Sequence, residues 1–180
     1  MLIVNEVDQA TINQTVGDVV ATLPVTNLQI YSNSRVFRTT SANEAQFTLV
    51  WDAPVIMSGA VLWRHNMSAS STWRVELFSD KAMTTKVYDT ADMPAVEQKT
   101  VGELEWLIDP LVTPADNSRL QSSEHWFANT LVYAMRITVK DPDSTAGFID
   151  VGRLYAGRAL QPIENFSFGH SFGWASKSDK

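Results

Sequence analysis

The amino-acid sequence predicts an all-β protein folded as a β-sandwich or jelly roll. Short segments alternate apolar and polar residues with a period of two, the pattern of a half-buried strand. Turn-forming residues separate these segments. No long segment carries apolar residues at helical spacing. The chain has 180 residues, of which 44% are hydrophobic, so it is long enough for one domain with a sizeable core.

The clearest strands lie in the first half of the chain. We expect residues 1–24 to form an N-terminal arm with one short strand, and residues 36–40 to form another. Residues 47–51 alternate clearly, and residues 55–65 follow after the Asp-Ala-Pro interruption. Residues 73–78 alternate as well, with tryptophan, valine and leucine on one face. These three segments carry the strongest strand signal in the first half of the chain.

The second half of the chain is less regular until its end. Prolines break residues 80–130 into short pieces. Residues 133–140 and 148–156 then alternate again, with the turn-forming run 141–146 between them, and we expect the two strands to pair. The sandwich is therefore predicted to span residues 25–160. Residues 161–180 form a separate C-terminal tail, rich in aromatic residues and glycine.

Composition argues against several classes of function. The net charge of -6 and the sequence pI of about 5.0 disfavour a broad electrostatic grip on nucleic acid or on an anionic membrane. The chain has no cysteine, which excludes disulfides, thiolate catalysis and cysteine-bound zinc. No apolar run approaches the roughly 18–20 residues that span a bilayer. The N-terminus also lacks the features of a signal peptide. We therefore expect no nucleic-acid partner and no membrane insertion.

Catalytic and metal-binding motifs are weak in this sequence. Residues 169–173 formally match Gly-x-Ser-x-Gly, but that motif needs a sharp turn between a buried strand and a helix, and here it lies in the tail. The three histidines, His65, His125 and His170, are scattered. Residues 141–144 have oxygen ligands but lack the spacing of a calcium loop. The sequence therefore predicts no enzyme activity, no cofactor and no metal site.

Three residues are candidates for binding a glycan. His65 and Asn66 follow a predicted strand and could form a polar cluster at a loop mouth, although a histidine that caps a turn explains them too. Trp126 lies in an irregular region and could stack on a sugar, pack against a partner, or simply seal an edge of the core. The other tryptophans on predicted strands, Trp51, Trp63 and Trp73, are expected in the core.

The tail supplies a second set of candidates. Its aromatic residues come after the sandwich is complete, and exposed aromatic side chains on a glycine-spaced segment are costly in water. They are expected either to fold back on the sandwich or to dock on another subunit. The predicted docking residues are Phe166, Phe168, Phe172 and Trp174.

The order of the strands resembles a known fold. Residues 134–139 read AMRITV and residues 149–157 read IDVGRLYAG. This closing pair resembles the last strands of the discoidin-like, galactose-binding-like jelly roll. The stretch from Gly152 to Ala159, with Gln161, Pro162 and the segment 169–174, looks like a group of tailed-bacteriophage structural proteins that carry this jelly roll. The resemblance covers roughly residues 25–175, and residues 85–125 do not contribute to it.

The resemblance implies a non-enzymatic structural component of a bacteriophage tail tip or baseplate. Such a protein would be made in the host cytoplasm and located in the virion. Its partners would be other tail or baseplate proteins, in several copies within a symmetric assembly. The alternative is a carbohydrate-binding module for adhesion to a host cell-surface glycan, held by loops at one end of the sandwich. Fold alone does not choose between them.

Overall fold

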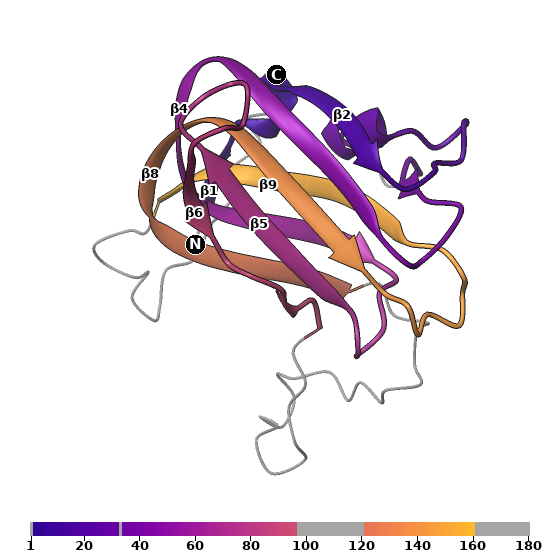
Figure 1. The fold of residues 1–180 in the computed structure, drawn as a ribbon. Helices are drawn as coiled ribbons and strands as arrows, with labels where there is room; N and C mark the ends of the chain where they lie inside the picture. The colour runs from indigo at the N-terminus through magenta and orange to yellow at the C-terminus, as the bar shows by residue number, and fades with distance from the viewer. Residues whose placement is uncertain (1, 33, 97–120, 161–180) are drawn as a thin grey trace, which may run out of the picture.

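The computed structural model describes residues 2–32, 34–96 and 121–160, which form a sandwich of antiparallel strands (Figure 1). Its only helical segments within that part of the chain are two 3-10 turns, so the all-β prediction is confirmed. The elements are β1 (Leu2–Asn5), η1 (Val7–Gln9), β2 (Thr11–Val16), η2 (Val25–Gln29), β3 (Phe37–Arg38), β4 (Ala45–His65), β5 (Thr72–Phe78), β6 (Lys86–Asp89), β7 (Met93–Pro94), β8 (Gln121–Lys140) and β9 (Asp150–Leu160).

Two long strands hold the sandwich together, because β4 and β8 each run through both layers (Figure 1). In the first layer, residues 45–50 of β4 lie between β2 and β8, and β8 in turn pairs with β5. In the second layer, residues 59–65 of β4 lie between β8 and β9, and β9 pairs with β1. The β4–β8 pairing is interrupted between Val50 and Val55. The Asp-Ala-Pro sequence therefore bends one strand rather than separating two.

The predicted pairing of residues 133–140 with residues 148–156 is wrong. The second half of β8 pairs with β4 and β5 in the first layer. Strand β9 pairs with β1, β3 and the second half of β4 in the other layer. The turn-forming run after β8 therefore crosses between layers, and does not close a hairpin.

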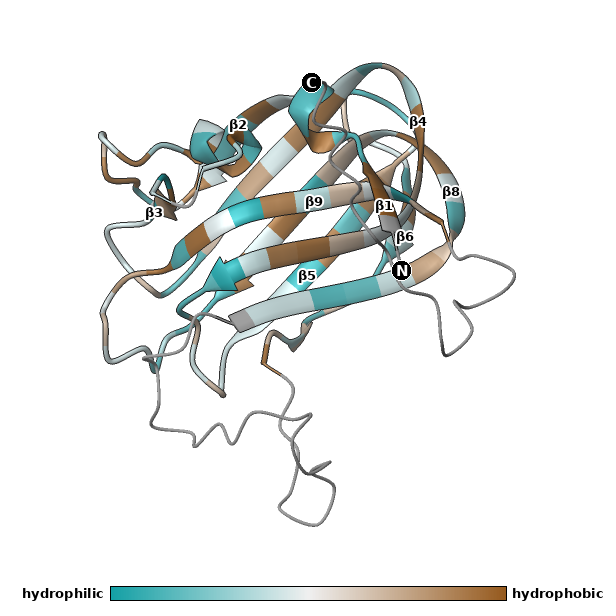
Figure 2. Cartoon of the chain, turned by 180° about the vertical axis from the view of Figure 1, so that it is seen from behind, coloured by the Kyte–Doolittle hydropathy of each residue, from teal (hydrophilic) through white to brown (hydrophobic). Residues whose placement is uncertain are grey.

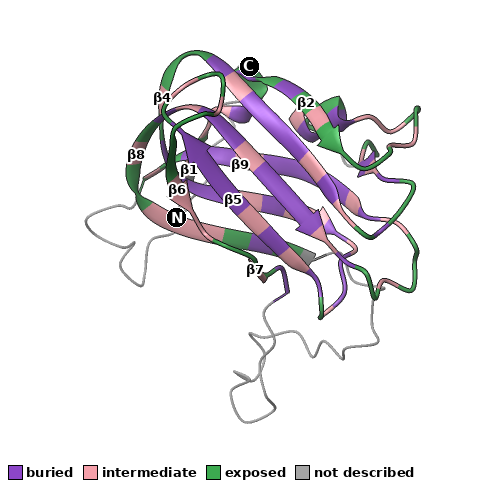
Figure 3. Cartoon of the chain, viewed as in Figure 1, coloured by how far each residue is buried: buried purple, intermediate pink, exposed green. Residues whose placement is uncertain are grey.

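The core fills the space between the two layers (Figures 2 and 3). Along the longer strands β4, β5 and β8 the inward side chains are mostly apolar and buried while the outward ones are more polar, because successive side chains point to opposite faces. Phe37 and Phe47 meet edge to face with ring centroids 5.8 Å apart. Trp51 and Trp73 are buried as predicted, but Trp63 is only half-buried and lies on the outer face of the second layer. Trp63 pairs with Arg153 across the strands, and the adjacent pair Leu62–Leu154 points into the core, so the side chain of Trp63 points outward.

The first residues of the chain contribute two strands, where one was expected. Strand β1 pairs with the end of β9, and β2 pairs with the start of β4. Gly157 makes the first pairing possible, since a Cβ there would lie 1.8 Å from the carbonyl oxygen of Val4. The boundary at residue 24 stays a prediction. The tail, residues 161–180 with Phe166, Phe168, Phe172 and Trp174, lies outside the described residues.

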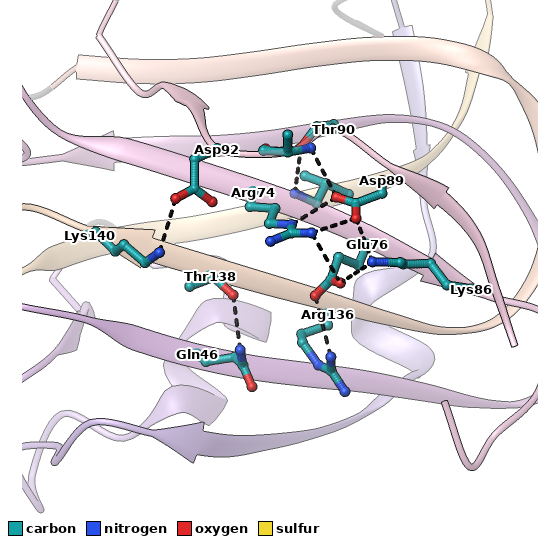
Figure 4. A network of polar contacts seen from close by, with 12 residues as sticks. Gln46, Arg74, Glu76, Lys86, Asp89, Thr90, Asp92, Arg136, Thr138 and Lys140 are labelled. Carbon is teal, nitrogen blue, oxygen red and sulfur yellow. Dashed lines mark hydrogen bonds and ion pairs between the residues drawn. The ribbon is translucent and has the colours of Figure 1, made fainter. Parts of the chain in front are cut away.

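The outer face of the first layer carries charges that satisfy one another (Figure 4). Arg74 makes two hydrogen bonds to Asp89, of 2.8 and 2.5 Å, and holds the pKa of that carboxyl well below its usual range. The nearly buried Glu76 accepts hydrogen bonds from Lys86 at 3.0 Å and Arg136 at 3.4 Å. This face therefore carries a network of ion pairs, in which the Nε of Arg136 has no hydrogen-bond partner among the described residues.

Candidate functional site

A cavity of about 980 Å³ opens where β4 ends and β5 and β8 begin. Its lining comes from residues 69–73, 94–96 and 122–126. One wall is the first part of β8, which within the described chain pairs only with β4 and so forms an edge of the second layer. The opposite wall is the loop before β5 together with β7. The cavity therefore separates the edges of the two layers.

A buried hydrogen-bonded chain forms the base of this cavity. The backbone N–H of Met67 donates to Nδ1 of His65 at 3.3 Å, so the ring proton is inferred to sit on Nε2. Nε2 then donates to the hydroxyl of Ser123 at 2.7 Å, and this hydroxyl donates to the carbonyl of Ala95. Burial lowers the pKa of His65 to about 4. Since Nε2 carries the proton, His65 is not placed as a base for Ser123, and the pair fastens β8 to the loops.

The loop between β4 and β5 is held by a buried carboxylate. Asp141, with no exposed surface, accepts the backbone N–H of Ser68 at 2.8 Å and also its hydroxyl. Ser71 donates its hydroxyl to the carbonyl of Ser68 at 2.6 Å. These bonds fix the loop conformation and leave Ser70 exposed at the rim.

Asn66 ties the same loop to the start of β9. Its side-chain nitrogen donates to the carbonyl of Phe148 at 3.1 Å, and its side-chain oxygen accepts the N–H of Asp150 at 2.7 Å. Both polar atoms of this amide are thus used within the protein. The role suggested by this geometry is to hold the loop.

The accessible side chains of the cavity come mainly from β8. Ser122 and Glu124 are exposed, and His125 and Trp126 are half-buried. Trp126 lies across Gly59, where an added Cβ would come within 2.3 Å of the indole. Only glycine leaves the space that this ring fills.

His125 belongs to a stack of three rings at the cavity edge. Its Nε2 lies 2.8 Å from the hydroxyl of Tyr88. Tyr88 and Phe127 stack with centroids 4.7 Å apart, and Phe127 lies 6.0 Å from the His125 ring. Burial lowers the pKa of His125, so the imidazole is neutral at pH 7 and can both donate and accept. The cavity thus combines aromatic surface with hydroxyl, carboxylate and imidazole groups.

The three predicted glycan-binding residues differ in position: His65 and Asn66 lie at the end of β4, whereas Trp126 lies opposite Gly59, nearer the middle of that strand. His65 is fully buried beneath the cavity, Asn66 is engaged with the backbone, and Trp126 is in the cavity wall. Their contact with a glycan stays a prediction. Sequence reasoning did not single out Ser70, Glu124 or His125 for this site. The polar run before residue 73 and the position of His125 beside Trp126 were the available signals.

Neither a metal site nor a membrane span is found in the part of the chain that the structure describes. No group of three or more histidine, aspartate or glutamate side chains there could hold a metal ion. No helix there is long and apolar enough to cross a membrane.

Comparison with solved structures identifies the fold. No protein-family model matches the sequence, and a search of curated proteins finds no match. The chain is similar in structure to chitosan-binding module 1 of a chitosanase/glucanase from Paenibacillus sp. IK-5, with a TM-score of 0.57 and 9% identity over 84% of this chain and 97% of that one. It also matches the Streptococcus pneumoniae fucose-binding module SpX-3, with a TM-score of 0.56 and 6% identity over 87% and 98%. A third match is CpGH89CBM32-5 from Clostridium perfringens in complex with GalNAc-β-1,3-galactose, with a TM-score of 0.56 and 7% identity over 83% and 96%.

These neighbours confirm the discoidin-like, galactose-binding-like jelly roll. They overturn the prediction of a structural role in a bacteriophage tail, since the neighbours are sugar-binding modules and nothing in the comparisons indicates a phage origin. The prediction was wrong because the strand motifs that supported it belong to the jelly roll and not to one use of it. The predicted alternative agrees better with these neighbours.

Proposed function

We propose that this protein is a non-catalytic carbohydrate-binding module and that the cavity beside β8 is its sugar site. The observation that carries the proposal is the half-buried indole of Trp126 in a cavity wall, next to exposed hydrogen-bonding groups. A sugar ring has an apolar face of C–H groups and a rim of hydroxyls. It therefore needs an aromatic surface and several donors and acceptors within one small space.

The polar groups of the cavity suit a neutral sugar. Ser70 and Ser122 can donate or accept, and Glu124 can accept from sugar hydroxyls. The neutral imidazole of His125 is held by Tyr88, which restricts its orientation. Among the described residues that line the cavity there is no lysine or arginine, so none of them offers an anionic group a cationic partner.

The rigid base supports binding rather than reaction. The His65–Ser123 pair is oriented as a structural bond, and the loop bearing Ser70 is fixed by Asp141. A preformed site loses little conformational entropy when a ligand binds. Its role in the cell, on this proposal, is to hold the protein on a glycan-covered host surface.

A direct titration tests the proposal. Fucose, GalNAc-β-1,3-galactose, the Lewis b oligosaccharide and glucosamine oligomers would be titrated into the full chain by calorimetry. We expect saturable binding of at least one, and Trp126→Ala should weaken it about ten-fold because the stacking surface is lost. Gln46→Ala, on the outer face of the first layer, is the matched control and should leave affinity unchanged. Absence of binding to all of these sugars at millimolar concentration would refute the proposal.

A further inference from the structure

The outer face of the second layer differs from that of the first. The strand register places Trp63 opposite Arg153 and Val61 opposite Tyr155, while Leu62 on the other side of β4 is buried in the core. Trp63 and Tyr155 are half-buried, and their ring centroids lie 6.5 Å apart at an interplanar angle of 71°. Two aromatic side chains therefore share a surface that faces solvent.

Two guanidinium groups lie against these rings. The Arg64 guanidinium is 5.3 Å from the Trp63 ring, and no carboxylate among the described residues pairs with it. The Arg153 guanidinium lies 5.2 Å from the Tyr155 ring and 5.4 Å from the Tyr31 ring. We refer to Tyr31, Trp63, Arg64, Arg153 and Tyr155 together as the aromatic face.

Arg153 has more hydrogen-bonding capacity than its described neighbours use. It is only 5% exposed, and its Nη2 donates to Asp8 at 2.6 Å. Its Nε and Nη1 atoms have no hydrogen-bond partner within the described chain. Buried donors without a partner are uncommon and costly, so this arginine is a group that an anionic ligand could satisfy once the covering side chain moves. The ring over it belongs to Tyr31, which is 85% exposed.

The backbone at this face is also unusual. Arg64 has a φ of 58°, in the left-handed region that residues other than glycine seldom occupy. It lies where the β4–β8 pairing shifts register between Trp63 and His65. A strained residue beside an exposed aromatic surface is a combination found more often at binding sites than at inert surfaces.

We propose that the aromatic face is a second carbohydrate-binding surface and that its ligand is a chain of acidic, carboxylate-bearing sugars. The sugar rings stack on Trp63 and Tyr155, and the carboxylates pair with the guanidinium groups of Arg64 and Arg153. This ligand class differs from the neutral sugar proposed for the cavity, so the inference goes beyond that proposal.

The surroundings favour this ligand over others. Strand β8 joins the two surfaces, since Trp126 faces outward opposite Gly59, beside the pair formed by Val61 and Glu124. On the first layer Arg74, Lys86 and Arg136 are paired with carboxylates (Figure 4). On the aromatic face Arg64 has no carboxylate partner among the described residues, and Arg153 is paired with Asp8 through Nη2 alone.

The experiment compares hexagalacturonate with its methyl ester, a matched ligand that has the same rings and no charge. Both are titrated into the full wild-type chain by calorimetry at low salt. The variants are Trp63→Ala, which removes a stacking surface, and Arg64→Asn, which removes the cation with a residue that tolerates the left-handed conformation. His125→Ala in the cavity and Gln46→Ala on the first layer are the controls. Thermal unfolding of each variant establishes that it is folded.

We expect Trp63→Ala to weaken hexagalacturonate binding about ten-fold and Arg64→Asn about five-fold. The methyl ester should bind more than about five-fold more weakly than the acid, because it loses its pairing with both arginines. Arg64→Asn should not weaken binding of the ester further, since its pairing with Arg64 is already lost. Both controls should leave these affinities unchanged. If His125→Ala loses neutral-sugar binding but still binds hexagalacturonate, the aromatic face and the cavity are separate binding sites.

Four results would overturn the inference. The first is no binding of hexagalacturonate, and the second is equal affinity for the acid and its ester. The third is tighter binding of a single-stranded DNA oligonucleotide than of hexagalacturonate, which would assign the face to another polyanion. The fourth is a wild-type dimer that Trp63→Ala dissociates in size-exclusion chromatography, which would assign the face to a second copy of the chain.

Discussion

Acidification should destabilise this protein through His65. The pKa of this side chain is lowered from 6.5 to about 4 because burial disfavours the charged imidazolium. Below about pH 6.5 the unfolded chain therefore binds a proton that the folded chain does not. The free energy of unfolding falls as the pH drops through this range, and it stops falling below the folded pKa. A shift of this size corresponds to a total loss of about 3 kcal/mol.

Part of this loss in unfolding free energy occurs in a pH range that is convenient for measurement. Between about pH 7 and pH 5, a single group with these two pKa values contributes a loss of about 2 kcal/mol. Carboxylates such as Asp89 have folded pKa values below this range, so their contribution is small there and equal in matched variants. The variant is His65→Gln, which cannot titrate but can still donate a side-chain hydrogen bond to Ser123.

The assay is urea unfolding of wild type and His65→Gln at both pH values. We expect His65→Gln to be less stable at pH 7, because its fit is imperfect, yet to lose about 2 kcal/mol less than wild type on acidification. His125→Gln is the control, since that imidazole is only partly buried. Equal losses in wild type and His65→Gln would show that His65 is not a buried neutral histidine and would refute the reasoning.

Three further substitutions test other parts of the structure. Gly59→Ala should displace the Trp126 ring, because the new Cβ would lie 2.3 Å from it. We expect about ten-fold weaker sugar binding in calorimetry and a change in the free energy of unfolding of less than about 1 kcal/mol. Gly157→Ala should push β1 away from β9, because its Cβ would lie 1.8 Å from the carbonyl oxygen of Val4. We expect the free energy of unfolding in urea to fall by about 1–3 kcal/mol and the backbone amides of β1 to exchange hydrogen faster. Asp141→Asn should loosen the loop before β5 by weakening the bonds to Ser68, at a cost of about 1–3 kcal/mol. Wild-type stability in either of the last two variants would contradict the contacts assigned to them.

Much of the fold could be predicted from local patterns. The segments 47–51, 55–65, 73–78 and 133–140 were recognisable because one face of each is buried, and burial imposes a period of two on the sequence. The resemblance of the closing strands to the discoidin-like jelly roll was also correct at the level of fold. It failed at the level of function, because a packing motif carries information about the core and not about ligands.

The site could be predicted only in part. Trp126 was recognised as a possible sugar-stacking residue, but its ring position depends on Gly59, which is distant in sequence. His65 and Asn66 were recognised as a polar cluster, but their exposure depends on Ser123, Phe148 and Asp150, which the fold brings to them. A short polar segment looks the same in sequence whether its groups face a ligand or the backbone.

Local alternation of apolar and polar residues was enough to establish that the chain is all-β and where most strands lie, because strand formation follows from this pattern. The sequence also excluded disulfides, since there is no cysteine. Three features became visible only in the folded structure: β4 and β8 run through both layers, β9 pairs with β4 and not with β8, and Trp63 faces outward beside Arg153. These features depend on register between strands far apart in the chain, and register is set by how whole layers pack together.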